Sequence, residues 1–330
     1  MQRVTVIFTG GTIAMRQSRG GGNRPTLRAD ELLASVPGLE KIATVEPIDW
    51  GLVPASHLTF DQVLDIGRIL DEQLRRPDID GAVIVQGTDV IEETAFAWDL
   101  LPLPAKPVIV VGAMRSASQD GYDGPENLRN AVAAATHAPL GTEGIVVAMA
   151  GQLHAADDVR KTHTHAYGTF QSPNLGPLGT VSDGRVHLAR HRHAVRLPAI
   201  PERAALPVPL VTAVLDDPVP GVEGLGGAAG VVVAATGGGN TTPGLLDLGT
   251  ALIALGVPVM LTTRCLSGHP LPGYGFPGGS TTWWDAGAVF SGSLGPLKSR
   301  VLLSLAVGAG LDVDAIGVVC ERFGGGRRRS

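Results

Sequence analysis

The chain has 330 residues, enough for two domains of ordinary size, each with its own hydrophobic core. Hydrophobic residues make up 44% of the sequence and charged residues 17%, a globular composition that excludes an intrinsically disordered chain. The formal net charge of −5 gives no basic field that would attract nucleic acid or an anionic membrane surface. We therefore expect no nucleic-acid partner and no membrane partner.

Cysteine usage and apolar patterning bear on the cellular compartment. Cys265 and Cys320 lie far apart and have no paired spacing, so neither a disulfide nor a zinc-thiolate site is expected. The first residues, MQRVTVIFTGG, read directly as a strand and lack the features of a secretory signal. The longest apolar stretch, 248–263, is interrupted by Gly256 and Pro258 and is shorter than the roughly 20 residues of a membrane span. These features predict a cytoplasmic protein.

In the first half of the chain, short runs rich in Val and Ile alternate with segments of helical periodicity. This pattern is typical of a parallel sheet buried on both faces, with helices as crossover connections. The predicted strands are 4–8, 82–85, 108–111 and 145–148, and the predicted helices are 61–74, 92–101 and 126–135. Thr88 and Asp89 precede the second helix as candidate caps, and Glu92 and Glu93 suit the positive end of its dipole.

The sequence changes character at about residue 190, where basic and proline-bearing residues disfavour both helix and central strand. The chain is therefore divided into a larger α/β domain at 1–190, a linker at 191–206 and a smaller α/β domain at 207–330. In the second domain the predicted strands are 208–215, 230–236 and 257–263, and the predicted helices are 245–255 and 297–305. The predicted fold class is thus two-domain α/β, with the larger parallel-sheet domain first.

Four predicted strands of the first domain end in glycine-rich or polar turns, at 9–12, 86–89, 112–115 and 150–152. In an open parallel sheet the carboxyl ends of the strands share one edge, where ligands bind, so these turns are expected to converge. Gly10 and Gly11 permit close backbone approach and can direct N–H groups at an oxyanion, and Thr12 places a hydroxyl beside them. A two-glycine turn can also simply reverse the chain, so its role stays open here.

Thr88, Asp89 and Lys161 form a second candidate set. A hydroxyl nucleophile needs a base, and a lysine that is desolvated or close to other cationic groups can be neutral enough to serve. The three residues would then act with the logic of a Ser-His-Asp triad. The alternative is that Thr88 and Asp89 only cap a helix and that Lys161 is a surface charge.

Cofactor sites are not predicted. Six histidines lie between residues 154 and 193, and His163 and His165 alternate as on a strand, but no carboxylate or cysteine spacing completes a metal site. The glycine run 237–239 lacks the Lys-Ser/Thr ending of a nucleotide-binding loop. We therefore expect neither a metal nor another cofactor.

Together the motifs resemble those of the bacterial-type L-asparaginase family nearly from end to end. The segments that carry the resemblance are TGGTIA at 9–14, GTD at 87–89, EETA at 92–95, VGAMR at 111–115, DGP with NL at 123–128, KT at 161–162, FQSPN at 170–174, GN at 239–240, SG at 291–292, and Lys298 with RVLL at 300–303. The match extends to the last predicted helix. It implies the two-domain α/β fold of that family.

The resemblance also implies an activity: hydrolysis of the carboxamide of asparagine or a related small amide, with release of ammonia and without a cofactor. Thr12 matches the residue that attacks the carbonyl, while Thr88, Asp89 and Lys161 match the activating triad. Which threonine attacks first stays open. Asp89 also matches the carboxylate that holds the substrate ammonium, and Asn240 matches a residue donated by a neighbouring subunit. The implied assembly is a homodimer or homotetramer with shared active sites.

Further substrate-binding positions follow from the same resemblance. Gly11, Gly87 and Ala113 are expected to line the substrate site. Ala55 aligns with the family serine that binds the substrate α-carboxylate, and Ser56 could replace that serine after a one-residue shift.

Three departures from the family pattern bear on specificity. Gly22 stands where the family carries a lid tyrosine, Ser280 stands near the position of an acidic residue contributed by the partner, and Gln86 stands where histidine is common. We therefore expect weak asparaginase activity and better turnover of an amide with an altered or uncharged head group, stacked on Trp283 or Trp284. Two alternatives remain: a hydrolase of another amide or a lactam on the same fold, and a non-catalytic or amidotransferase-type subunit.

Overall fold

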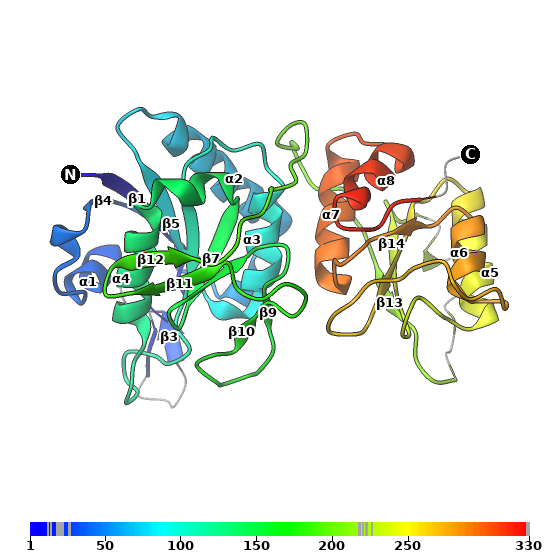
Figure 1. Ribbon diagram of the computed structural model, residues 1–330, viewed down its shortest axis with the longest axis horizontal. Helices are drawn as coiled ribbons and strands as arrows, with labels where there is room; N and C mark the ends of the chain where they lie inside the picture. The colour runs from blue at the N-terminus through cyan, green and yellow to red at the C-terminus, as the bar shows by residue number, and fades with distance from the viewer. Residues whose placement is uncertain are drawn as a thin grey trace. The chain divides into compact units, whose positions relative to one another are not determined.

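The structure is a computed structural model that describes residues 1–11, 13, 15–17, 23–25, 28–216, 219, 221, 224–225 and 227–327. It contains two compact units, Met1–Arg196 and Leu197–Ser330, each with its own sheet (Figure 1). The predicted two-domain α/β fold is confirmed. The boundary between the units falls inside the segment predicted as a linker. Among the described residues, none of the helices has both the length and the apolar character needed to cross a bilayer.

An eight-stranded sheet forms the centre of the first unit, in the order β12-β11-β8-β7-β6-β5-β1-β4. Its strands are β1 (Arg3–Phe8), β4 (Thr44–Asp49), β5 (Gly81–Val85), β6 (Val108–Val111), β7 (Ile145–Met149), β8 (Gln152–Ala155), β11 (Gly179–Ser182) and β12 (Arg185–Leu188). From β4 to β7 neighbouring strands are parallel, and β8, β11 and β12 continue the sheet with antiparallel pairing. The four strands predicted for this domain are all present.

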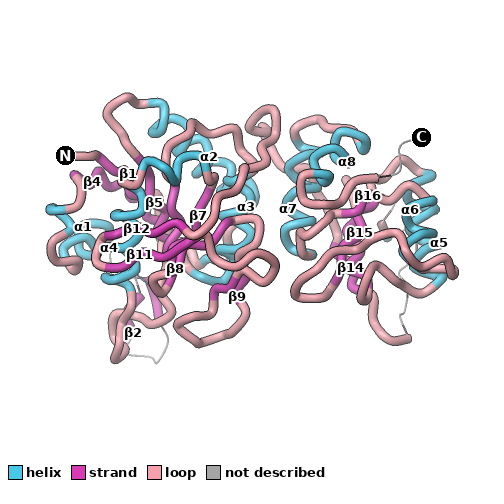
Figure 2. The backbone as a smooth tube through the Cα atoms, in the orientation of Figure 1, coloured by secondary structure: helices cyan, strands magenta, loops and turns pink. Residues whose placement is uncertain are grey.

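Helices α2 (Phe60–Arg75), α3 (Ile91–Asp99) and α4 (Gly124–Ala135) connect the parallel strands and pack on them, as predicted (Figure 2). The first unit also contains α1 (Ala29–Ala34) and the 3-10 turns η2 (Leu39–Lys41), η3 (Ala55–His57), η4 (Thr88–Val90) and η5 (Ala138–Thr142). Strand β4 was not predicted because Pro47 and its charged neighbours interrupt the apolar pattern. Proline is tolerated there because β4 is an edge strand.

The predicted caps of α3 are wrong. The residue that precedes the helix is Val90, whose side chain makes no capping hydrogen bond. Thr88 and Asp89 lie one step earlier, in η4, and their side chains are engaged elsewhere. Glu92 and Glu93 occupy the first turn, as expected.

Two short antiparallel pairs complete the first unit. Strands β2 (Met15–Gln17) and β3 (Asn23–Pro25) form one pair, and β9 (Arg160–Lys161) and β10 (Phe170–Gln171) form the other. Neither pair is hydrogen-bonded to the eight-stranded sheet. The β9–β10 hairpin matters for function because it carries Lys161.

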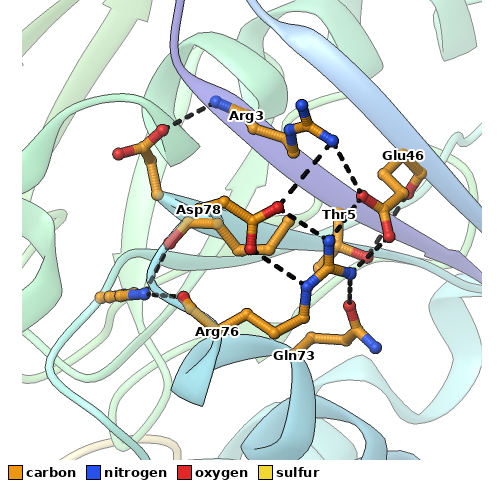
Figure 3. A network of polar contacts seen from close by, with 9 residues as sticks. Arg3, Thr5, Glu46, Gln73, Arg76 and Asp78 are labelled. Carbon is orange, nitrogen blue, oxygen red and sulfur yellow. Dashed lines mark hydrogen bonds and ion pairs between the residues drawn. The ribbon is translucent and has the colours of Figure 1, made fainter.

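A charged network lies where β1 begins, at the amino edge of the sheet (Figure 3). Arg76, just after α2, binds Glu46 of β4 at 2.5 Å and Asp78 at 2.9 Å, and the Arg3 guanidinium lies 3.6 Å from the Glu46 carboxylate. Hydrogen bonds from Arg76 hold the pKa of Glu46 and the pKa of Asp78 below their ordinary values. The network therefore connects β1, β4 and the end of α2.

Buried charges hold the last residues of the first unit. The Arg192 side chain is buried, and its guanidinium binds both oxygens of Asp99, at 2.5 and 2.6 Å, and Asp157 at 2.7 Å. The backbone N–H of Arg192 also donates to the Glu143 carboxylate. Burial raises the pKa of Asp99, and the guanidinium opposes that rise. Part of the segment predicted as a linker is thus packed firmly on the first unit.

The second unit contains a parallel sheet in the order β13-β14-β15-β16. Its strands are β13 (Leu210–Thr212), β14 (Val231–Ala235), β15 (Val259–Thr263) and β16 (Val289–Phe290), and its helices are α5 (Pro243–Ala254), α6 (Ser280–Asp285), α7 (Pro296–Gly308) and α8 (Val313–Glu321). The strand predicted at 208–215 is shorter than expected, because Pro209 has no N–H to donate and the chain turns at residues 215–216. Strand β16 and helices α6 and α8 were not predicted.

Trp283 belongs to the core of the second unit. Its side chain is 0% exposed, its ring packs against Gly249 of α5, and its indole N–H donates to Thr241 Oγ1 at 2.9 Å. The expectation that Trp283 stacks on a substrate is therefore wrong. Trp284 packs edge-on against Phe290, with 5.2 Å between ring centroids, and so contributes to the same core.

Candidate active site

The carboxyl ends of β1, β5, β6 and β7 share one edge of the sheet, because these strands are parallel neighbours. The turns after β1 and β5 are in backbone contact there. A Cβ atom on Gly11 would lie 2.1 Å from the Gly87 nitrogen, and Gly11 has a φ of +94° that favours glycine. The backbone of Gly87 thus leaves no room for a side chain at Gly11, although the two residues are 76 positions apart in the sequence.

The turn after β6 is also packed closely against the β5 turn. A Cβ atom on Gly112 would lie 2.8 Å from the Gln86 carbonyl oxygen and 2.9 Å from Thr88 Cγ2. The Asn127 amide donates to the Gly112 carbonyl at 3.1 Å, and its oxygen accepts from the Ala150 N–H at 3.2 Å. Asn127 therefore ties the turns after β6 and β7 together, which was not predicted.

Lys161 reaches this edge from the β9–β10 hairpin. Its ammonium donates to Thr88 Oγ1 at 2.9 Å and to Asp89 Oδ1 at 3.0 Å. Thr88 is buried, the Lys161 side chain is 17% exposed and the Asp89 side chain is 64% exposed. A buried hydroxyl thus contacts a largely desolvated amine, while one carboxylate faces solvent. The arrangement suits proton transfer at the hydroxyl and recognition of a cationic group by the carboxylate.

Thr12 and Gly22 lie outside the described residues, but both chain neighbours of Thr12 are described. Gly11 is packed on Gly87, as above. Ile13 is fully buried, and its carbonyl accepts a hydrogen bond from the Tyr122 hydroxyl at 2.6 Å. Sequence reasoning missed Tyr122, because nothing in the local pattern signals a contact with a turn 109 positions away.

Both halves of the chain match known protein families. Residues 3–194 match the family described as "Asparaginase, N-terminal", and residues 218–326 match "Glutaminase/Asparaginase C-terminal domain". The chain belongs to the asparaginase family. The predicted family is therefore confirmed.

Individual relatives cover almost the whole chain. A Haemophilus influenzae protein named "Probable L-asparaginase periplasmic" is 33% identical over 98% of this chain and 93% of the relative, and Escherichia coli K12 "L-asparaginase 2" is 31% identical over 98% and 94%. The crystal structure of "Probable Cytoplasmic L-asparaginase from Campylobacter jejuni" superimposes with a TM-score of 0.85 at 28% identity, covering 98% of this chain and 99% of that chain. The two-domain asparaginase fold thus extends over both units.

Other predicted binding residues of this asparaginase-family chain also lie near the β5 turn. Ala55 is buried in η3, and a Cβ atom on Gly87 would approach the Ala55 methyl group to 2.8 Å. Ser56 is the next residue of η3 and is exposed, and Ala113 is buried in the turn after β6. The predicted set Gly11, Ala55 and Gly87 is thus one packed cluster.

Asn240 lies in the second unit, in the turn after β14. Its side-chain oxygen accepts from the Ser280 N–H at 3.3 Å, and the Ser280 hydroxyl accepts from the Gly273 N–H at 3.2 Å. Ser280 is fully buried at the start of α6. Ser280 therefore supports the turn that carries Asn240.

The alternating histidines do not lie on a strand. They belong to the loop between β9 and β10, where His163 Nδ1 accepts from the N–H groups of His165 and Ala166 at 3.0 Å each. Across the described residues, no group of three or more His, Cys, Asp or Glu side chains is arranged to hold a metal ion. His163 thus shapes the loop that follows Lys161.

Proposed function

We propose that this chain is an asparaginase-like amidohydrolase that cleaves the carboxamide of asparagine or a related small amide and releases ammonia. The observation that carries the proposal is the contact of Lys161 with both Thr88 and Asp89 at the edge where the glycine turns meet. Membership of the asparaginase family supports it, as do relatives named L-asparaginase and "Glutaminase-asparaginase".

In the proposed reaction the Thr12 hydroxyl attacks the amide carbon. The hydroxyl proton passes to a base, the C–N bond breaks, and ammonia leaves with a proton returned to its nitrogen. Water then cleaves the threonine ester and regenerates the hydroxyl. Backbone N–H groups of the glycine turns are suited to stabilise the oxyanion, because the close contact of Gly11 with Gly87 leaves them preorganised.

Thr88, Lys161 and Asp89 have separate roles in this proposal. Lys161 relays a proton through the Thr88 hydroxyl, which also orients the attacking water. Asp89 pairs with the substrate ammonium, because its carboxylate is exposed to solvent and contacts Lys161 through Oδ1.

In our proposal, this chain differs from an efficient asparaginase in how it binds the charged head group of free asparagine. A zwitterionic amino acid needs a donor for its carboxylate, and a charge buried without a partner costs several kcal/mol. Ala55 supplies no donor, and Ser280 supplies no acid. We therefore propose weak affinity for free asparagine and better turnover of an amide whose head group is altered or uncharged.

A homodimer or homotetramer is part of the proposal. Asn240 would complete the site of a neighbouring subunit, so Thr12→Ala and Asn240→Ala chains, each inactive alone, should regain activity when co-assembled. Full activity in a monodisperse monomer would contradict shared sites. We also propose a cytoplasmic location, which is supported by two cysteines that are both free.

The decisive experiment measures ammonia release by the purified chain across asparagine, glutamine, succinamate-like amides and small lactams.

Three variants test the mechanism in the same assay. Thr12→Ala, Thr88→Ala and Lys161→Met should each lower kcat at least about a hundredfold, as expected when a nucleophile or proton-transfer group is removed. Lys106→Met is the matched control, because the Lys106 ammonium binds backbone carbonyls of residues 76 and 79, away from this site. Wild-type rates in the threonine variants would refute the mechanism. Sub-millimolar affinity for asparagine would refute our account of specificity, and a lack of turnover without a partner protein would favour the amidotransferase alternative.

A further inference from the structure

The hairpin that carries Lys161 makes few backbone hydrogen bonds of its own. Strand β9 pairs with β10 through two residue pairs, Lys161 with Phe170 and Arg160 with Gln171. An isolated two-stranded ribbon is marginally stable at best in water. The position of the Lys161 ammonium against Thr88 therefore depends on what anchors this hairpin to the rest of the unit.

One anchor is a buried hydrogen bond directly after β10. The Ser172 hydroxyl lies 2.9 Å from His154 Nδ1. His154 belongs to β8 and pairs with Val147 of β7, so its backbone is fixed within the eight-stranded sheet. His154 is 1% exposed and Ser172 is also buried. The bond thus joins the base of the hairpin to the centre of the unit.

The buried side chain of His154 is polar, at a position where an apolar side chain could serve for packing alone. Its Nε2 atom is buried and has no hydrogen-bond partner among the described residues. Burial lowers the pKa of His154 to about 4, with Asp158 opposing the shift and Arg190 adding to it, so the ring is neutral at physiological pH. A buried polar atom without a hydrogen-bond partner lowers the stability of the fold, and an apolar residue would avoid that loss. The ring therefore contributes something that a leucine would not, namely the bond to Ser172.

A second anchor closes the same end of the hairpin. Asp158, three residues before Lys161, accepts from the Asn174 N–H at 3.1 Å, the Asn174 amide at 2.9 Å and the Leu175 N–H at 2.8 Å. Asp158 is buried. The chain entering β9 is thereby fixed to the chain leaving β10, and Ser172 lies within that leaving segment. Displacement of Ser172 would consequently be transmitted to Lys161.

We infer that His154 is a positioning residue for the reaction: through Ser172 it holds the β9–β10 hairpin so that the Lys161 ammonium stays within hydrogen-bond distance of Thr88. The inference rests on the proposed function, in which Lys161 transfers the proton. A displacement of about 1 Å at a catalytic group can cost on the order of a hundredfold in rate. Loss of the His154–Ser172 bond should therefore lower kcat without removing any group that touches substrate.

The test compares variants that remove or keep the bond. Ser172→Ala and His154→Leu should lower kcat about tenfold or more and change KM less than about twofold, because the substrate contacts are intact. His154→Asn places an amide near the position of Nδ1 and should restore most of the rate. Ser35→Ala is the matched control, since it removes a serine hydroxyl that donates to the Leu32 carbonyl at 2.6 Å at the end of α1, and it should leave kcat unchanged. Wild-type kcat in Ser172→Ala would overturn the inference.

A double variant separates positioning from general damage. If the bond acts through Lys161, adding Ser172→Ala to Lys161→Met should cause no further loss, whereas multiplied losses would overturn the inference. Wild-type activity in Lys161→Met itself would instead overturn the proposed function. The two failures are therefore distinguishable.

Discussion

The contact between the two glycine turns makes Gly11→Ala the most sensitive test of the site. An alanine Cβ would lie 2.1 Å from the Gly87 nitrogen, 2.3 Å from the Gly87 Cα and 2.7 Å from the Gln86 carbonyl carbon, all of which are backbone atoms that cannot rotate away. The φ of +94° adds strain of about 1–3 kcal/mol, and overpacking typically costs about 1–3 kcal/mol more. The expected destabilisation of about 2–6 kcal/mol is a large share of the roughly 5–15 kcal/mol that stabilises a typical native protein.

Urea unfolding and ammonia release together measure this effect. Gly11→Ala should lower the unfolding midpoint and lower kcat more than about tenfold, because the β1 and β5 turns can no longer touch. Gly184→Ala is the matched control: its φ is +72°, but nothing lies within 4 Å of the added Cβ, so only the backbone strain remains. If Gly11→Ala unfolds at the same urea concentration as Gly184→Ala and keeps wild-type kcat, the close packing described here is refuted.

Two further predictions concern stability and thiol reactivity. Arg76 lowers the pKa of Glu46 and the pKa of Asp78, so these carboxylates stabilise the fold above their ordinary pKa values and lose that contribution as the pH falls through their lowered pKa values. The urea unfolding midpoint of Arg76→Gln should therefore depend less on pH, between about pH 3 and 5, than the wild-type midpoint does. An equal dependence of the two midpoints on pH would contradict this prediction. Burial raises the pKa of the Cys320 thiol to about 12, so a disulfide reagent at about pH 8 should label one thiol in the native protein, the exposed Cys265, and two after unfolding. Two fast thiols in the native state would contradict the burial of Cys320.

Much of the fold was predictable because its signals are local. The buried strands of the first unit are short runs of Val and Ile, and their parallel order follows from the helices between them. To predict that the turns after these strands converge, it was enough to know that the carboxyl ends of parallel strands lie at the same edge of the sheet. Strand β4 escaped prediction because an edge strand can contain Pro47 and charges. Strand β13 was overestimated because flanking residues looked equally apolar.

The site was predictable in its motifs and much less so in its contacts. Thr88, Asp89 and Lys161 were singled out from the sequence, yet the helix-cap alternative for Thr88 was resolved only by the structure. Trp283 was misassigned, since an aromatic residue near a family motif gives no sign of whether it faces a core or a ligand. The partners Tyr122 and His154 act across long sequence separations, where no periodicity connects them to the residues they hold.

The buried Arg192 sets a chemical limit on where the first unit can end. A polypeptide that stopped at residue 190, where the sequence composition changes, would lack the guanidinium and leave the Asp99 carboxylate buried without its cation. The Glu143 carboxylate would lose the N–H of the same residue. A fragment of the first unit that folds by itself must therefore extend past Arg192. A chimaeric protein that replaces the second unit with another domain would likewise have to keep residues 191–192 with the first unit.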